Sequence, residues 1–353
     1  MNGYKILKNK AAGHDGTLTD NEGLLVFKPL NEQEKQFYQQ IQTRNQDYDN
    51  DDEEEDIPLQ TWMPTFLGVL NEGKQNAPIN REHMTIIPDD SDAHLEILQN
   101  APNTTLDKKD YLVLENLLAG FSEPNIMDIK LGKKLFDENA TEEKVERMKK
   151  VSETTTSGSL GFRICGMQLQ KNSNHQFDPS HVEHRVDNDN NAEYTFVNKL
   201  FGRTRNTDNI NEAIELFFNN QNLSSKRQKM LKSMFLMRLQ LFYNTLLNEE
   251  VRMISSSLLF IFEGDEKRWD LKNDNDDVLN NIFIEDASEE EGGEGEGEDN
   301  EALKQKNSRK YPLSSMTLID FAHSKVTPGQ GYDENVIEGI ESLIGIFTDI
   351  YEK

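Results

Sequence analysis

Short apolar runs separated by polar, turn-rich stretches dominate the first third of the chain. They span residues 24–29, 62–70 and 111–118, and each has the length and composition of a strand. Between the first two runs, residues 31–43 have the pattern of a helix. Residues 71–107 are polar and contain prolines, which predicts a long loop before the third strand.

After residue 118, apolar runs alternate with longer helical periodicities. Strands are predicted over 124–132, 158–169, 257–262 and a late run ending at Ile319, helices over 142–150, 210–219, 224–249 and from 333, and a polar loop over 172–192. On the last helix, Val336, Ile340 and Phe347 fall on one stripe that we expect to be buried. The mixture predicts an α+β fold with two lobes, residues 1–118 and residues 119–353.

The composition is that of a water-soluble chain. Hydrophobic residues make up 35% of the 353 residues. No apolar run reaches the roughly 18–20 residues of a membrane span. The first residues are polar, so we expect no signal peptide. The single cysteine, Cys165, excludes an internal disulfide and a cysteine-based zinc site, and we expect an intracellular protein.

Two acidic tracts account for most of the net charge of −26. Residues 47–56 carry eight acids and no base, residues 285–301 carry ten acids and no base, and the remainder of the chain has a net charge of −8. Both tracts lack the apolar side chains of a core, so we expect disordered inserts, the second extending over about 285–310. Such inserts are either solvated loops or acidic surfaces for a basic partner, and the sequence does not choose between them.

Residues 124–132 combine proline, aspartate, lysine and glycine in the pattern P-x-x-x-D-x-K-x-G. On a strand, residues two apart point to the same side, so Asp128 and Lys130 would face one cleft together. A lysine there can hold phosphate charge, and an aspartate can contact a ribose or a reacting hydroxyl, as phosphoryl transfer requires. The sequence leaves these two roles of Asp128 open.

Three further elements occur in the order expected for an ATP-dependent kinase. Lys28 on an early strand can hold ATP phosphates, and Asp320 after a late apolar strand can hold Mg²⁺. Between them, Glu115 and Leu117 follow a buried strand and can contact adenine through their backbone. An ordinary protein kinase is excluded, because Asp128 and Asp320 are 192 residues apart and no H-R-D, D-F-G or A-P-E motif occurs.

The helix predicted over 142–150 is cationic on one side. Lys144 and Arg147 lie within about 60° of each other on a helical projection, whereas Glu142 and Glu146 lie opposite. Such a helix is either a solvated face or a binding surface for a polyanion beside the phosphoryl-transfer site.

These motifs resemble those of the inositol polyphosphate kinase family. The signature P-x-x-x-D-x-K-x-G is complete at residues 124–132, and the chain also has the family's S-S-L-L element at 256–259 and its I-D-F-A-H element at 319–323. The similarity is greatest to the fungal multikinases within the family and includes VSETTTSGSLGFRICGM and PGQGYDENVIEG. It implies a two-lobed, protein-kinase-like or ATP-grasp-like α+β fold, with an inserted helical inositol-binding lobe at about 137–170.

The resemblance also implies roles for single residues. Lys28 would contact the ATP phosphates, Glu115 and Leu117 the adenine, Asp128 the ribose or the acceptor hydroxyl, Lys130 the inositol phosphates and the transferred group, Asp320 the Mg²⁺ ion, and Lys144, Arg147, Lys150 and His323 the inositol substrate. Asp128, Lys130 and Asp320 would be the catalytic residues. The assignment of a role from the family is less direct for Arg147 and Lys150, because animal members have other residues at these positions.

The activity implied by the resemblance is ATP- and Mg²⁺-dependent phosphorylation of inositol 1,4,5-trisphosphate, stepwise to tetrakis- and pentakisphosphates. A narrower trisphosphate 3-kinase or a hexakisphosphate kinase would share every catalytic residue. Fungal members are also linked to transcriptional control of arginine metabolism through MADS-box transcription factors, so a nuclear location is expected and a cytoplasmic one stays open. A regulatory scaffold that binds a basic transcription factor through residues 285–301, without itself binding nucleic acid, is the alternative of another class.

Overall fold

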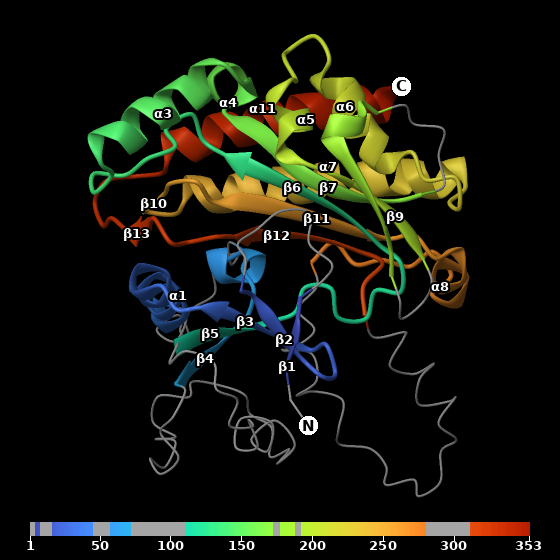
Figure 1. Ribbon diagram of the computed structural model, residues 1–353, viewed down its shortest axis with the longest axis horizontal. Helices are drawn as coiled ribbons and strands as arrows, with labels where there is room; N and C mark the ends of the chain where they lie inside the picture. Colours follow the sequence, from blue (N-terminus) through green and yellow to red (C-terminus); the bar gives the residue numbers. More distant parts are fainter. Residues whose placement is uncertain are drawn as a thin grey trace, which may run out of the picture.

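Two main antiparallel sheets lie one above the other in the computed structural model (Figure 1). The structure describes residues 4–7, 16–44, 57–71, 110–171, 177–187, 192–279 and 311–353. Both predicted acidic inserts lie outside these residues, and so does the loop predicted over 71–107 except for Asn71. Within the described part of the chain, no helix is both long and apolar enough to cross a membrane.

The lower sheet in Figure 1 has five strands in the order β1-β2-β3-β5-β4. They are β1 (Tyr4–Ile6), β2 (Leu18–Asp20), β3 (Leu25–Pro29), β4 (Phe66–Asn71) and β5 (Asp110–Glu115), with α1 (Glu32–Arg44) after β3. The predicted strand at 24–29 and the predicted helix are confirmed. The strand predicted at 111–118 is confirmed up to Glu115, and residues 116–118 turn away from it. The strand predicted from Trp62 is wrong at its start, since Leu59–Trp62 forms the 3-10 helix η2. β4 begins only after Pro64, which has no N–H to donate to a neighbouring strand.

The sheet in the middle of Figure 1 has six strands in the order β12-β11-β6-β7-β9-β8. They are β6 (Pro124–Leu131), β7 (Phe162–Gln170), β8 (Val182–Val186), β9 (Glu193–Val197), β11 (Ser257–Glu263) and β12 (Ser314–Ile319). β6 carries the P-x-x-x-D-x-K-x-G motif and pairs with β11 on one side and β7 on the other. The motif therefore lies on a central strand, as predicted.

Helices cover one face of this six-stranded sheet (Figure 1). They are α5 (Lys199–Arg203), α6 (Ile210–Phe218), α7 (Ser225–Leu247) and α11 (Glu334–Glu352). The side chains of Ser224 and Asp333 cap α7 and α11 by accepting backbone N–H groups of the first turn. These helices confirm the predictions at 210–219, at 224–249 and from 333.

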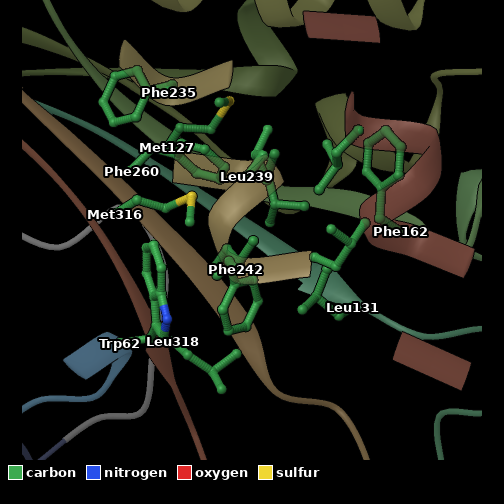
Figure 2. Close-up of a cluster of buried hydrophobic side chains, with 14 of the residues drawn as sticks. Trp62, Met127, Leu131, Phe162, Phe235, Leu239, Phe242, Phe260, Met316 and Leu318 are labelled. Atoms are coloured by element: carbon green, nitrogen blue, oxygen red, sulfur yellow. The ribbon is translucent and has the colours of Figure 1, made fainter. Parts of the chain in front are cut away.

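Figure 2 shows the apolar core between the sheet and the helices. Along β6, Met127, Ile129 and Leu131 are fully buried in it, against side chains of α7 such as Phe235 and Phe242. Because side chains alternate along a strand, the intervening Asp128 and Lys130 point to the opposite face. One face of β6 therefore packs into the core, and the other face carries Asp128 and Lys130.

Two secondary-structure predictions for the segments that follow β6 in the chain are wrong. Residues 158–160 belong to the helix α4 (Thr156–Leu160), and β7 starts only after Gly161, which ends that helix with φ +71°. The polar loop predicted over 172–192 contains β8, which follows the short 3-10 helix η4 (Pro179–His181) and is the last strand of the sheet. β8 has no buried residue, so its hydrophobic pattern carries no strand signal.

Three other elements lie outside these layers. The charged helix predicted over 142–150 is α3 (Glu142–Glu153), and α8 (Glu266–Leu271) follows β11. A small sheet pairs β10 (Val251–Met253) with β13 (Ser324–Val326). Of the predicted insertion at about 137–170, residues 162–170 form β7 in the middle of the large sheet, so its helical part ends at Leu160.

A continuous core joins the two halves of the molecule. Trp62 of η2 is 2% exposed, and its Nε1–H donates to Oγ1 of Thr245 on α7 over 3.0 Å. Its ring lies 5.3 Å from that of Phe242, centroid to centroid. Arg44 at the end of α1 also pairs with Glu249, just after α7. The segment between the lower sheet strands β3 and β4 is therefore anchored on the upper half, while the boundary at residue 118 stays a prediction.

Candidate active site

Lys28 lies at the centre of an ionic cluster between the two sheets. Its Nζ is 2.8 Å from Oε1 of Glu34 on α1 and 2.8 Å from Oδ1 of Asp320, which follows β12. The backbone N–H of Phe321 donates to the same Oε1 of Glu34 over 3.1 Å. A strand lysine paired with a helix glutamate, next to an aspartate followed by phenylalanine, is the arrangement that protein kinases use to hold ATP phosphates and metal.

The backbone at Asp320 aims its side chain at Lys28. Asp320 has φ +67°, a left-handed conformation that costs energy for a side chain with Cβ and is tolerated best by asparagine and aspartate. The fully buried Phe321 holds this turn in place, since its ring stacks on Phe37 at 5.0 Å and meets Tyr38 edge-on at 5.1 Å. The strained residue is thus fixed by the aromatic core beside it.

The two carboxylates keep Lys28 charged. Burial lowers the pKa of its amine, but Asp320 and Glu34 outweigh burial and raise the pKa above its usual value. Glu34 has a side chain only 1% exposed, so both charges of this pair are largely removed from water. A fixed positive charge in such a place suits the phosphates of a nucleotide.

Asp128 and Lys130 face the same side of β6, as predicted. Asp128 is 5% exposed, and its Oδ1 is buried without a hydrogen bond from any residue that the structure describes. Burial, and then the charge of Asp320, raise its pKa to about 6, against the opposing effects of Lys130, Ser257 and Arg163. Lys130 donates from Nζ to the carbonyl of Ser255 over 2.6 Å. The structure thus brings Asp128, Lys130 and Asp320 to one place.

The glycine of the motif is required by its surroundings. Gly132 has φ +93°, and a Cβ at this position would lie 2.4 Å from Nδ2 of Asn335. Its N–H donates to the carbonyl of Gly161 over 2.7 Å. A residue with a side chain would push β6 away from the start of α11, so Gly132 fixes where Lys130 stands.

The predicted hinge follows β5. The N–H of Glu115 donates to the carbonyl of Thr65 over 3.0 Å, and burial raises the pKa of its carboxyl group. Asn116 holds the turn, because Nδ2 donates to the carbonyl of Gly23 and Oδ1 accepts the N–H of Leu118. The N–H of Leu117 makes no hydrogen bond with the described residues, so it is the backbone donor left for an adenine ring.

The cations of α3 are placed apart from this cluster. Lys144 is half-buried, Arg147 and Lys150 are exposed, and none of the three forms an ion pair with a described residue. Thr141 caps the helix by accepting the N–H of Lys144. The structure gives no contact between these side chains and Asp128, so their part in the site rests on a ligand that would reach both.

His323 lines a pocket of about 510 Å³. Lys134, Arg252 and Lys325 are the other cationic residues of its wall. Nδ1 of His323 is 2.5 Å from Oδ2 of Asp137, at the start of the segment that leads into α3. The volume suits a small polar molecule, and the wall presents both these cations and four carboxylates, those of Asp137, Glu138, Asp333 and Glu334.

Sequence reasoning missed three charged residues of the site. Glu34 could have been found, because it shares a helical stripe with the buried Phe37, Tyr38 and Ile41. Arg163 pairs in register with Lys130 and adds positive charge near Asp128, which only the strand pairing reveals. Asp137 gives no signal in the sequence, since its partner is 186 positions away.

The residues fit a nucleotide with a divalent metal. The described residues contain no group of three or more histidine, cysteine or acidic side chains that could hold a metal alone. Mg²⁺ at phosphoryl-transfer sites needs only one or two carboxylates, with phosphates and water completing its shell. Asp320, whose charge acts on Asp128, and the buried Oδ1 of Asp128, which accepts no hydrogen bond from a described residue, supply that pattern. When bound, the ion would neutralise phosphate charge, and Lys28 would add its own positive charge to the same task.

Comparison with known proteins decides the family. The inositol polyphosphate kinase family matches residues 111–348. The chain belongs to this family. The inositol polyphosphate multikinase of Saccharomyces cerevisiae is 52% identical over 98% of both chains, and that of Schizosaccharomyces pombe is 27% identical over 98% of this chain and 97% of its own.

A solved structure of a family member has the same fold. The crystal structure of the S. cerevisiae inositol phosphate multikinase in complex with ADP and Mn²⁺ matches with a TM-score of 0.68 and 48% identity, over 92% of this chain and 98% of the other. The two-lobed kinase-like α+β fold expected from the sequence is thereby confirmed. The roles of the single site residues stay predictions that the geometry above makes testable.

Proposed function

We propose that this protein is an inositol polyphosphate multikinase, which transfers the terminal phosphoryl group of ATP to hydroxyls of inositol 1,4,5-trisphosphate and of the tetrakisphosphate formed from it. The observation that carries the proposal is the position of Lys28, bonded to both Glu34 and Asp320, together with the charge of Asp320 acting on the buried Asp128. The name and the nucleotide of the similar yeast enzyme support it.

Each group has a task set by its charge and position. Lys28 holds phosphate oxygens of ATP, Asp320 holds the metal, and the N–H of Leu117 receives the adenine. Lys130 balances the charge of the transferred group, as positioning and charge neutralisation are the main needs of phosphoryl transfer. Asp128 has a pKa of about 6, so it can either accept a proton from an acceptor hydroxyl or hydrogen-bond a ribose. These two roles predict different kinetic effects when Asp128 is substituted.

Incubation of the purified full-length chain with ATP, Mg²⁺ and inositol 1,4,5-trisphosphate tests the proposal. Tetrakis- and then pentakisphosphate should accumulate, and Lys130→Ala and Asp320→Ala should lower kcat by about a thousandfold or more, as expected when a principal charge-stabilising group is removed. Folding of both variants is checked by their melting temperature. Turnover at the wild-type rate in either variant, or no product at all, would reject the assignment.

The breadth of the substrate range separates a multikinase from a trisphosphate 3-kinase. The open substrate side, with α3 exposed, favours acceptance of more than one inositol phosphate. Product mapping over the time course decides, since a 3-kinase would stop at one tetrakisphosphate.

We also propose a second role in the nucleus, in which the acidic tract at 285–301 binds a MADS-box-type transcription factor that controls arginine metabolism. The ten acids in this tract support it, because a basic DNA-binding partner would be attracted to them. Deletion of residues 285–301 should abolish co-purification with the factor and leave inositol phosphate kinase activity intact. Unchanged binding after deletion would refute the role of the tract.

A further inference from the structure

His323 and Asp137 form a close pair that the activity does not by itself require. Nδ1 of His323 lies 2.5 Å from Oδ2 of Asp137, and the side chains are 36% and 9% exposed. The other carboxylate oxygen, Oδ1, accepts the N–H of Asn139 over 3.1 Å. The carbonyl of His323 accepts the N–H of Ile254 over 3.3 Å. Both partners are therefore held by their own surroundings as well as by each other.

This contact determines which nitrogen of His323 carries a proton. An ionised carboxylate only accepts hydrogen bonds, so Nδ1 must donate. Nε2 points away from Asp137 and makes no hydrogen bond with a residue that the structure describes. His323 lines the pocket of about 510 Å³, so Nε2 is the nitrogen that a ligand there can reach.

The other cations of the pocket wall are mostly engaged. Arg252 donates to the carbonyls of Gln330 and Gly331, and Lys325 pairs with Glu138 at 2.5 Å. Lys134 lies over the ring of Phe136, 5.8 Å from its centroid, and forms no ion pair within the described residues. His323 and Lys134 are thus the wall cations whose polar ring nitrogen Nε2 and ammonium Nζ make no hydrogen bond or ion pair with a described residue, whereas Lys325 keeps two of its three donors beside its pair with Glu138.

We propose that Asp137 is a positioning residue for His323, holding Nδ1–H so that Nε2 is presented to a phosphorylated polyol in this pocket. This inference rests on the proposed function, because the polyol is the inositol phosphate substrate. Neutral imidazole accepts a substrate hydroxyl at Nε2, and imidazolium donates from Nε2 to a phosphate oxygen. Asp137 acts only through the ring and does not touch the substrate.

The Asp137–His323 pair could also have a purely structural role, which is to hold the loop before α3 against the turn after β12. The experiments must separate this structural role from the positioning role. The same loop has a second tie of that kind, the pair of Lys133 with Glu338 on α11 at 2.5 Å. Both partners are about half-exposed, so the pair is expected to contribute little. Glu338→Gln is therefore a matched control for loosening the loop.

Kinetics of the full-length chain provide the first test. Asp137→Ala should raise KM for inositol 1,4,5-trisphosphate about tenfold, a typical effect of losing one hydrogen bond to a charged group, and leave KM for ATP unchanged. Asp137→Asn keeps an acceptor oxygen and should fall between Asp137→Ala and wild type, whereas Glu338→Gln should behave as wild type. In a His323→Ala background, Asp137→Ala should add nothing, since it acts only through the ring.

A spectroscopic test does not depend on turnover. In the unliganded protein at alkaline pH, nitrogen-15 shifts of the His323 ring, assigned by comparison with His323→Ala, should show the Nδ1–H tautomer, and Asp137→Ala should shift the population towards Nε2–H. An additive effect in the double variant, or an unchanged tautomer in Asp137→Ala, would reduce the pair to a tether and overturn the proposal. If wild type shows the Nδ1–H tautomer but no turnover, the proposed function fails instead, so the two failures are distinguishable.

Discussion

Charged side chains on the two sides of the cleft differ in burial and in partners. On the nucleotide side, Lys28 and Glu34 are 20% and 1% exposed and are bonded to each other and to Asp320. On α3, the helix that we propose to bind the substrate, Arg147 and Lys150 are exposed and unpaired among the described residues. The first region is organised before any ligand binds, and the second relies on the ligand to bring its charges together.

This difference suits the two ligands. ATP is the same molecule in every catalytic cycle. A rigid set of charged groups around Lys28 can therefore be arranged in advance for its phosphates. The acceptor changes at each step of a stepwise kinase, and exposed cations on a helix can meet different patterns of phosphates without rebuilding. The contrast predicts that substitutions on the nucleotide side change stability and kcat together, while those on α3 change KM alone.

The largest effect should follow loss of Glu34. Glu34→Ala leaves Lys28 partly buried with one carboxylate fewer, and breaking such a pair should lower the free energy of unfolding by about 3 kcal/mol. The phosphate-binding lysine also loses its support from α1, so kcat should fall by about a hundredfold. Urea denaturation and steady-state kinetics measure the two effects.

Glu32 of the same helix provides the control. Its pair with Lys35 has a carboxylate that is 62% exposed, so Glu32→Ala should change stability by less than about 0.5 kcal/mol. If Glu34→Ala were equally mild, the ionic cluster would not be the organised region that we describe.

A pH-dependent effect of opposite sign is expected at Asp128. Its pKa is raised from 3.8 to about 6, so the folded state binds more protons than the unfolded state between these values, and stability falls as pH rises through this window. Above it, the buried charge costs about 3 kcal/mol, which Asp128→Asn removes. Without nucleotide and metal, the variant should melt at a higher temperature than wild type at pH 7.5, with the gap closing towards pH 4.

The same variant should have little or no turnover. A gain in stability together with a loss of activity would show that the carboxylate is kept for chemistry at a cost to the fold. Equal melting temperatures at both pH values would show that the buried charge is compensated by its neighbours.

The smallest effects are expected on α3. Lys144→Ala and Arg147→Ala should each raise KM for inositol 1,4,5-trisphosphate about three- to tenfold, on the order of 1 kcal/mol, with KM for ATP and the melting temperature unchanged. Added salt should reduce the difference from wild type. Lys149→Ala, a change of the same charge on the opposite side of the helix, should have no effect, and equal effects of all three would mean a diffuse field rather than a binding face.

Local patterns in the sequence were sufficient for much of the fold and part of the site. The run around Asp128 was predicted to be a strand on which Asp128 and Lys130 point to the same side, and both lie on one face of β6. Lys28 and Asp320 were singled out separately, and they form an ion pair. Each of these features depends on residues close together in the chain, where side-chain period and composition are informative.

The failures have a physical cause in common. β8 is an edge strand with no buried side chain, so its strand pairing comes from the backbone and leaves no hydrophobic pattern. The start of β4 depends on Trp62, because its ring packs against α7 instead of the lower sheet. In both places tertiary contacts set the local structure.

The sequence by itself determined the parts of this kinase: a lysine on an early strand, a central D-x-K strand, a late aspartate and a cationic helix. The tertiary structure decided how they meet, by bringing Glu34 against Lys28, the charge of Asp320 near Asp128, and Asp137 against His323. Strand and helix periodicity is written in neighbouring residues, whereas the pairing of charges across the cleft arises only when distant segments pack around a shared core.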